Sequence, residues 1–267
     1  MRILSLSLII LATPAVSHEL WLEPLAYTVP ADGRITGNIV NGENFGGMDL
    51  VYLPARIARY EVIAGDASAP VEMRAGDRPG LDAPALAEGL NVVVYQSTPT
   101  ELTYKEFEKF ERFLKHKDLG LTGAEHLANG HPETEFVEVY TRYSKTLVGV
   151  GNAEGSDRDL GLETEFIALS NPYTEDTSGG FQAMLTYQGT ARADAQVEIF
   201  DKAGPDAEAV ITTLRTDANG VVTVPVEKGH TYMLDAVVLR DPAPDLAEKY
   251  NAIYETLWAN LTFAVPE

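Results

Sequence analysis

Apolar and polar residues alternate with a period of two along most of the chain. Between residues 18 and 100 the alternation occurs in short runs separated by Gly, Pro, Asn and Asp, such as "ELWLEPLAYTV" and "GLNVVVYQS". It returns between residues 160 and 267, for example in "GFQAMLTYQG" and "GHTYMLDAVVLR". This alternation is typical of strands that bury one face. The sequence therefore predicts a mainly β protein with two antiparallel β-sandwich domains, at 18–100 and 160–267.

Residues 101–148 follow a different period. The segment "LTYKEFEKFERFLKHK" places its phenylalanines on one stripe of a helix, and Thr103 and Glu106 have the spacing of a capping box. The segment "HPETEFVEVYTRYSKTL" repeats the helical spacing, and Pro132 suits a first helical turn. We therefore expect a helical hairpin insertion at 101–148 whose aromatic stripes belong to the core.

The first 17 residues have the pattern of an export signal. An apolar run over residues 3–12 follows Arg2, and Pro14 ends it. The run is shorter than the roughly 20 residues that cross a bilayer. "AVS" at 15–17 then supplies a small-x-small cleavage pattern. We interpret residues 1–17 as a signal peptide, which predicts a periplasmic or secreted protein.

The cleavage position decides the chemistry of His18. A cut after Ser17 makes His18 the first residue of the mature chain, so that its α-amine and ring Nδ1 can chelate one metal ion. A cut after Ala15 or Ala12 would leave His18 internal, with only its imidazole. The small-x-small pattern favours Ser17.

Composition and charge narrow the possible functions. The 267 residues contain no cysteine, so a lipoprotein anchor and thiolate chemistry are excluded. Any metal site must use histidine, carboxylate, amine or backbone oxygen. The net charge of −20, which becomes −21 once Arg2 is removed, disfavours nucleic acid and anionic membranes and attracts cations. After the signal, no segment is long and apolar enough to span a membrane.

Motifs for catalysis are absent from the sequence. It has no Gly-x-Ser-x-Gly elbow, phosphate loop or His-Glu-x-x-His pair, and no carboxylate pair stands out by context. We therefore predict no enzyme activity.

Three of the five histidines are candidate metal ligands. His18 would chelate through its amine and ring, a donor set that Cu(II) and Ni(II) favour. His230 lies in "KGHTYMLD" at the start of a predicted strand, and His126 lies in the loop between the predicted helices. We expect the three to share one ion at the seam between the domains. His131 ranks lower, and His116 at a helix C-terminus complements the helix dipole without a functional role.

Several segments resemble known families. "TLRTDANGVVTVPVEKGHTYMLDAVVL" resembles the prealbumin-like, or carboxypeptidase-regulatory-like, β-sandwich. "HELWLEP", "LTYKEFEKFERFLKHKDL", "HLANGHPETEFVEVYTRYSKTLV", "GHTYMLDAVVLR" and "ETLWANLTF" together resemble a bacterial domain-of-unknown-function family. That family is labelled the periplasmic component of a cobalt transport system or a nickel-uptake substrate-specific protein. The resemblance implies that His18, His126 and His230 match recurrent histidines of the family.

Three functional hypotheses follow. The first is an extracytoplasmic protein that captures Ni, Co or Cu and delivers the ion to a membrane metal transporter. The second is a secreted β-sandwich module that binds a polymer or a protein partner. The third and weaker one is a copper-dependent oxidase, because an N-terminal histidine chelate can support oxygen chemistry.

Overall fold

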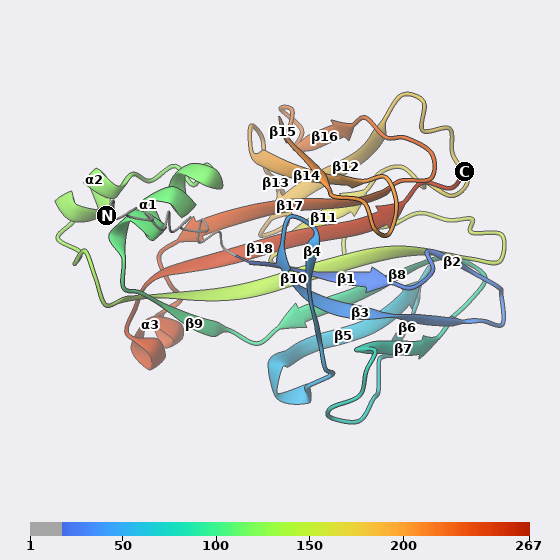
Figure 1. Ribbon diagram of the computed structural model, residues 1–267, viewed down its shortest axis with the longest axis horizontal. Helices are drawn as coiled ribbons and strands as arrows, with labels where there is room; N and C mark the ends of the chain where they lie inside the picture. The colour runs from blue at the N-terminus through green and yellow to red at the C-terminus, as the bar shows by residue number, and fades with distance from the viewer. Residues whose placement is uncertain (1–17) are drawn as a thin grey trace, which may run out of the picture.

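The computed structural model describes residues 18–267, so the predicted signal peptide lies outside the described residues. One ten-stranded sheet runs through the molecule (Figure 1). Its strands are, in sheet order, β15 (Val210–Arg215), β14 (Gln196–Lys202), β17 (Thr231–Arg240), β18 (Ala252–Ala264), β10 (Phe136–Val150), β8 (Gly89–Ser97), β5 (Ile57–Ala64) and β6 (Ala67–Pro70), while β2 (Thr28–Val29) and β9 (Thr100–Tyr104) also pair with β10.

Two smaller sheets pack against this large sheet. The first comprises β1 (Glu19–Pro24), β3 (Arg34–Glu43), β4 (Gly46–Leu50) and β7 (Leu81–Pro84). The second comprises β11 (Thr164–Ala168), β12 (Phe181–Tyr187), β13 (Thr190–Ala191) and β16 (Val221–Val224).

Each small sheet shares an apolar core with the large one. Leu22 and Ile39 of the first small sheet pack with Val62 and Val93 of the large sheet. Phe181 and Leu185 of the second small sheet pack with residues of β14, β17 and β18. The prediction of a mainly β protein built from packed antiparallel sheets is therefore confirmed. The two sandwiches are joined within one sheet, because β10 pairs in parallel with β18.

The predicted second helix is wrong. Residues 136–150 form β10, which is buried on both faces and pairs with strands on either side. A strand buried on both faces does not alternate, so its large residues can imitate a helical spacing. The β-branched residues Val137, Val139 and Thr141 favour the strand.

The first predicted helix is confirmed as α1 (Phe107–His116). Its predicted capping box is wrong, because Thr103 lies in β9 and Glu106 caps the helix without a side-chain hydrogen bond. A capping box occurs instead at Thr122 and Glu125, before α2 (Gly123–Ala128).

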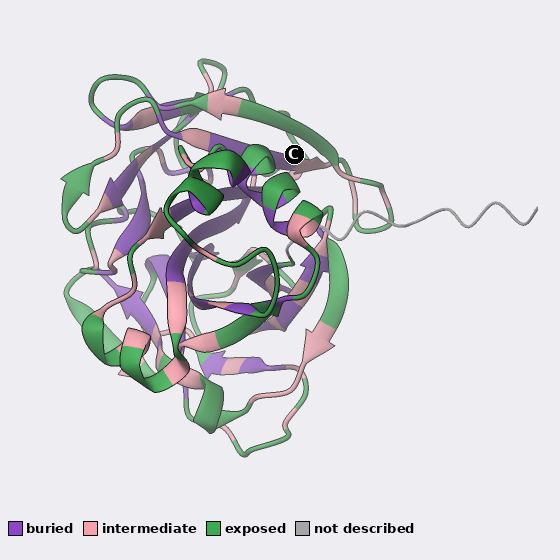
Figure 2. Ribbon diagram, turned by 90° about the vertical axis from the view of Figure 1, so that its left-hand side faces the viewer, coloured by how far each residue is buried: buried purple, intermediate pink, exposed green. Residues whose placement is uncertain are grey.

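The helices lie mainly at one end of the molecule. In Figure 1, α1, α2 and α3 (Pro244–Tyr250) gather at the end opposite the C-terminus, and Figure 2 looks onto that end. A one-turn helix, η1 (Pro54–Arg56), precedes β5. Among residues 18–267, no helix has the length and apolar character needed to cross a bilayer.

Candidate functional site

His18 lies at an exposed edge, just before β1. Its side chain is 56% exposed, and its ring reaches over the end of the neighbouring strand β3. Nε2 lies 3.1 Å from Oε1 of Glu43, and Nδ1 lies 3.2 Å from the amide nitrogen of Asn41. A carboxylate only accepts hydrogen bonds, so the neutral ring carries its proton on Nε2. Nδ1 then carries no proton, and its lone pair accepts a hydrogen bond from the Asn41 amide.

The backbone around His18 is held by buried neighbours. Arg142 of β10 donates a hydrogen bond to the carbonyl oxygen of His18, and its guanidinium stacks 3.9 Å over the ring of Trp258. The next residue, Glu19, pairs with Gly42 of β3 and is buried. The first described residue is therefore attached to a fixed strand, although its own ring is exposed.

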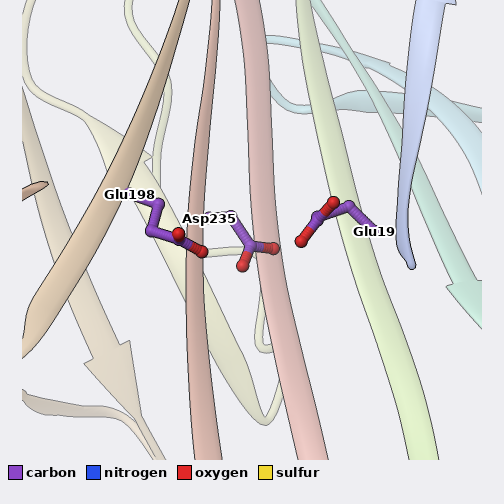
Figure 3. Close-up of side chains that lie close together, drawn as sticks. All are labelled: Glu19, Glu198 and Asp235. Carbon is purple, nitrogen blue, oxygen red and sulfur yellow. The ribbon is translucent and has the colours of Figure 1, made fainter. Parts of the chain in front are cut away.

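A buried cluster of charges anchors Glu19. Glu19, Glu198 of β14 and Asp235 of β17 point toward one another (Figure 3). Lys117, which follows α1, donates to all three carboxylates, at 2.9 Å from Glu19 and 2.8 Å from Asp235. His116 lies 2.8 Å from the other oxygen of Glu198. The three carboxylates bring oxygens within 4.8 Å of one another, but an ion would have to displace the Lys117 ammonium.

Burial and pairing shift the pKa values in this cluster. Burial raises the pKa of Glu19 to about 7, although the Lys117 ammonium opposes this shift. Burial also raises the pKa of Asp235. The hydrogen bond that Nε2 of His116 donates to Glu198 raises the pKa of His116. Burial acts to raise the pKa of Glu198, but hydrogen bonds from His116 and Lys117 outweigh it and lower that pKa.

These shifts predict that the protein is more stable in mildly acidic solution. The raised pKa of Glu19 means that the folded state binds more protons than the unfolded state between about pH 4.5 and pH 7, so stability falls as pH rises through that window. The raised pKa of His116 acts in the same direction above about pH 6.5. Urea unfolding should therefore give a larger free energy at pH 5.5 than at pH 8, and Glu19→Gln should reduce the difference. Equal or greater stability of the wild-type protein at pH 8 would contradict this prediction.

His126 lies inside the helical end of the molecule. It is fully buried, and its ring packs against Phe110 and Phe136. Nε2 lies 2.9 Å from the carbonyl oxygen of Pro132, which can only accept, so Nε2 is the donor. Nδ1 then accepts from the hydroxyl of Tyr254 at 3.0 Å. Both ring nitrogens are therefore engaged in hydrogen bonds. The His126 ring links α2 to β18 and has a structural role.

His230 lies at the opposite end of the large sheet. Its Nδ1 is 2.7 Å from Oδ1 of Asp201, and its side chain is 20% exposed. Its backbone carbonyl accepts a hydrogen bond from Val265, just beyond the end of β18. His230 and Asp201 therefore form a half-buried hydrogen-bonded pair just before β17.

The expectation that one ion joins His18, His126 and His230 is wrong. His126 contacts Tyr254 of β18, whereas His230 contacts Val265, eleven positions further along. At strand spacing this separation is about 36 Å. His18 lies between them, since its partner Arg142 pairs with Trp258. Metal binding by any one of these residues remains a prediction.

The charge cluster around Lys117 was not foreseen from the sequence. Its members come from four distant segments, so spacing along the chain does not connect them. A local signal does exist, because Asp235 interrupts the apolar run "YMLDAVVL" and Glu198 interrupts "QVEIF". Acidic residues in such positions are seldom buried unless they are paired.

Comparison with known proteins places the chain in a family but not in a functional class. No curated protein and no solved structure matches it significantly. One protein family, described as "Domain of unknown function (DUF4198)", matches residues 15–240, which is most of the chain and includes β1 to β17. This match agrees with the resemblance to a domain-of-unknown-function family, and it does not address the cobalt or nickel label. The chain therefore belongs to the DUF4198 family.

Proposed function

We propose that this protein binds one transition-metal ion at a mature amino terminus that begins with His18, and passes the ion to a membrane uptake system outside the cytoplasm. The observation that carries the proposal is the contact between Nε2 of His18 and Glu43 at 3.1 Å. This contact selects the tautomer in which Nδ1 carries no proton, so a metal ion can bind there by displacing the Asn41 amide. A carboxylate behind a ligating imidazole also orients the ring and raises its basicity.

The surroundings of His18 suit a cation because the Glu43 carboxylate lies beside the ring. An ion bound at Nδ1 would take the place of the hydrogen bond from the Asn41 amide. If cleavage follows Ser17, the α-amine of His18 is free. The amine and Nδ1 can then bind one ion in a six-membered chelate ring. An α-amine has a pKa of about 7.7–8.0, so it can lose its proton to a metal near neutral pH. The net charge of −20 raises the local concentration of cations.

Metal titration of the mature protein, residues 18–267, tests this proposal. Amine and imidazole ligands should bind Cu(II) more tightly than Ni(II), and Ni(II) more tightly than Co(II). His18→Ala should remove the binding, whereas His131→Ala, the matched control, should leave it intact. Failure of all three ions to bind tighter than about 0.1 mM, roughly −5.5 kcal/mol, would refute the proposal.

A second candidate function is supported by a groove beside β4. The groove has a volume of about 220 Å³, and apolar side chains form most of its wall, which also includes the charged residues Asp49, Arg56 and Arg78. Exposed Met48 and Leu53 contribute to the wall. A concave apolar surface with a few polar groups is typical of ligand sites. A binding module that used this groove would bind its partner equally well after His18→Ala, which separates the two functions.

A further inference from the structure

Met48 lies on the same face of the small sheet as His18. It is 68% exposed, in the edge strand β4. It stands directly opposite Asn41 in the β3–β4 ladder, and Asn41 is the residue whose amide contacts Nδ1 of His18. Residues directly opposite one another in an antiparallel pair point to the same face. The residue of β1 directly opposite Asn41 is Leu20, so His18, two positions earlier, reaches Asn41 diagonally. His18, Asn41 and Met48 therefore form a diagonal row across three adjacent strands.

The Asn41 amide marks the position between the two outer residues of this row. Side chains directly opposite one another have Cβ atoms about 4.5–5.5 Å apart. A methionine has three rotatable bonds, so its sulfur can reach over a neighbouring strand. An ion that displaced the Asn41 amide from Nδ1 would lie above Asn41, between the ring of His18 and the side chain of Met48.

The chemistry of such a ligand set selects copper. Amine and imidazole nitrogens suit Cu(II), whereas a thioether is a soft ligand that favours Cu(I). The chain contains no cysteine, so methionine sulfur is its only soft donor. We propose that Met48 is a third ligand of the His18 site and that the cargo is copper, held in both oxidation states. This inference rests on the proposed function, and it replaces nickel and cobalt with copper as the physiological ion.

Cu(I) binding by the mature protein tests the role of Met48. The affinity is measured without oxygen, by competition with a chromophoric Cu(I) chelator, and Cu(II) is titrated in parallel. Met48→Leu should weaken Cu(I) binding by about 10- to 100-fold, the range found when a metal site loses a supporting group. It should change Cu(II) binding less than about 3-fold, because the nitrogen ligands remain. Leucine keeps the apolar wall of the groove, so a groove ligand would not distinguish the two proteins.

The controls separate this inference from the proposed function. Met73→Leu, on another part of the surface, should bind both ions like the wild-type protein. If Met48→Leu binds Cu(I) as tightly as the wild-type protein while His18→Ala does not, Met48 is not a ligand and the N-terminal site stands. If His18→Ala also binds both ions normally, the N-terminal site itself is wrong.

Discussion

Replacing Lys117 with Met is expected to lower the free energy of unfolding by about 3–5 kcal/mol, the usual cost of removing one partner from a buried charge cluster. The ammonium of Lys117 donates to Glu19, Glu198 and Asp235, and every one of these side chains is at most 3% exposed. Methionine has a similar length, so the main change is the loss of the charge. Three carboxylates would then share a buried space with no ammonium between them. Denaturant unfolding at pH 7 measures the effect.

The matched control for this prediction is Lys115→Met. Lys115 lies in the last turn of the same helix and is exposed, so its replacement should change stability by less than about 0.5 kcal/mol. A loss below about 1 kcal/mol for Lys117→Met would show that the cluster is not held by the ammonium. The effect of Lys117→Met should also shrink toward pH 5, because Glu19, with its pKa raised to about 7, then becomes neutral.

Acetylation of the α-amine of His18 in the mature protein is expected to weaken Cu(II) binding by about 100-fold or more. Acetylation turns the amine into an amide and leaves no other free amine beside the ring. The ring and Glu43 remain, so the change isolates the amine. Loss of even an outer group costs a metal site 10- to 100-fold in affinity. Calorimetric titration of residues 18–267 with and without the acetyl group measures the difference.

The same acetylation of the His18→Ala protein controls for effects of the treatment elsewhere in the chain. It should leave the residual Cu(II) binding of that variant unchanged. Equal affinity of the wild-type protein with and without the acetyl group would show that the amine is not a ligand.

The period-two pattern predicted the sheets best where a strand buries one face. The runs "RITGNIVNGE" and "GFQAMLTY" became β3 and β12, in which buried residues largely alternate with more exposed ones. The same logic failed for β10, which is central in the large sheet and buried on both faces. Pairing partners determine such a strand, and pairing is not encoded in local spacing.

The candidate site was predictable only in part. His18 could be identified because the signal-like pattern ends next to it. Its partners Asn41 and Glu43 could not, since their contacts depend on the register between β1 and β3. The sequence analysis placed His126 and His230 at one site between the two domains. The sequence does not reveal that they lie near opposite ends of β18, which spans 13 residues. The pairing register between strands that are distant in the sequence determines how far apart these histidines lie.

Native mass spectrometry of the protein exported by a living cell, supplied with copper, tests the central claim most directly. Its mass reports both the first residue and any bound ion in one measurement. We predict a chain that begins at His18 and carries one copper ion, with the ion lost in the His18→Ala variant. A mature chain that begins at any other residue, or a chain that begins at His18 and carries no metal, would contradict the account.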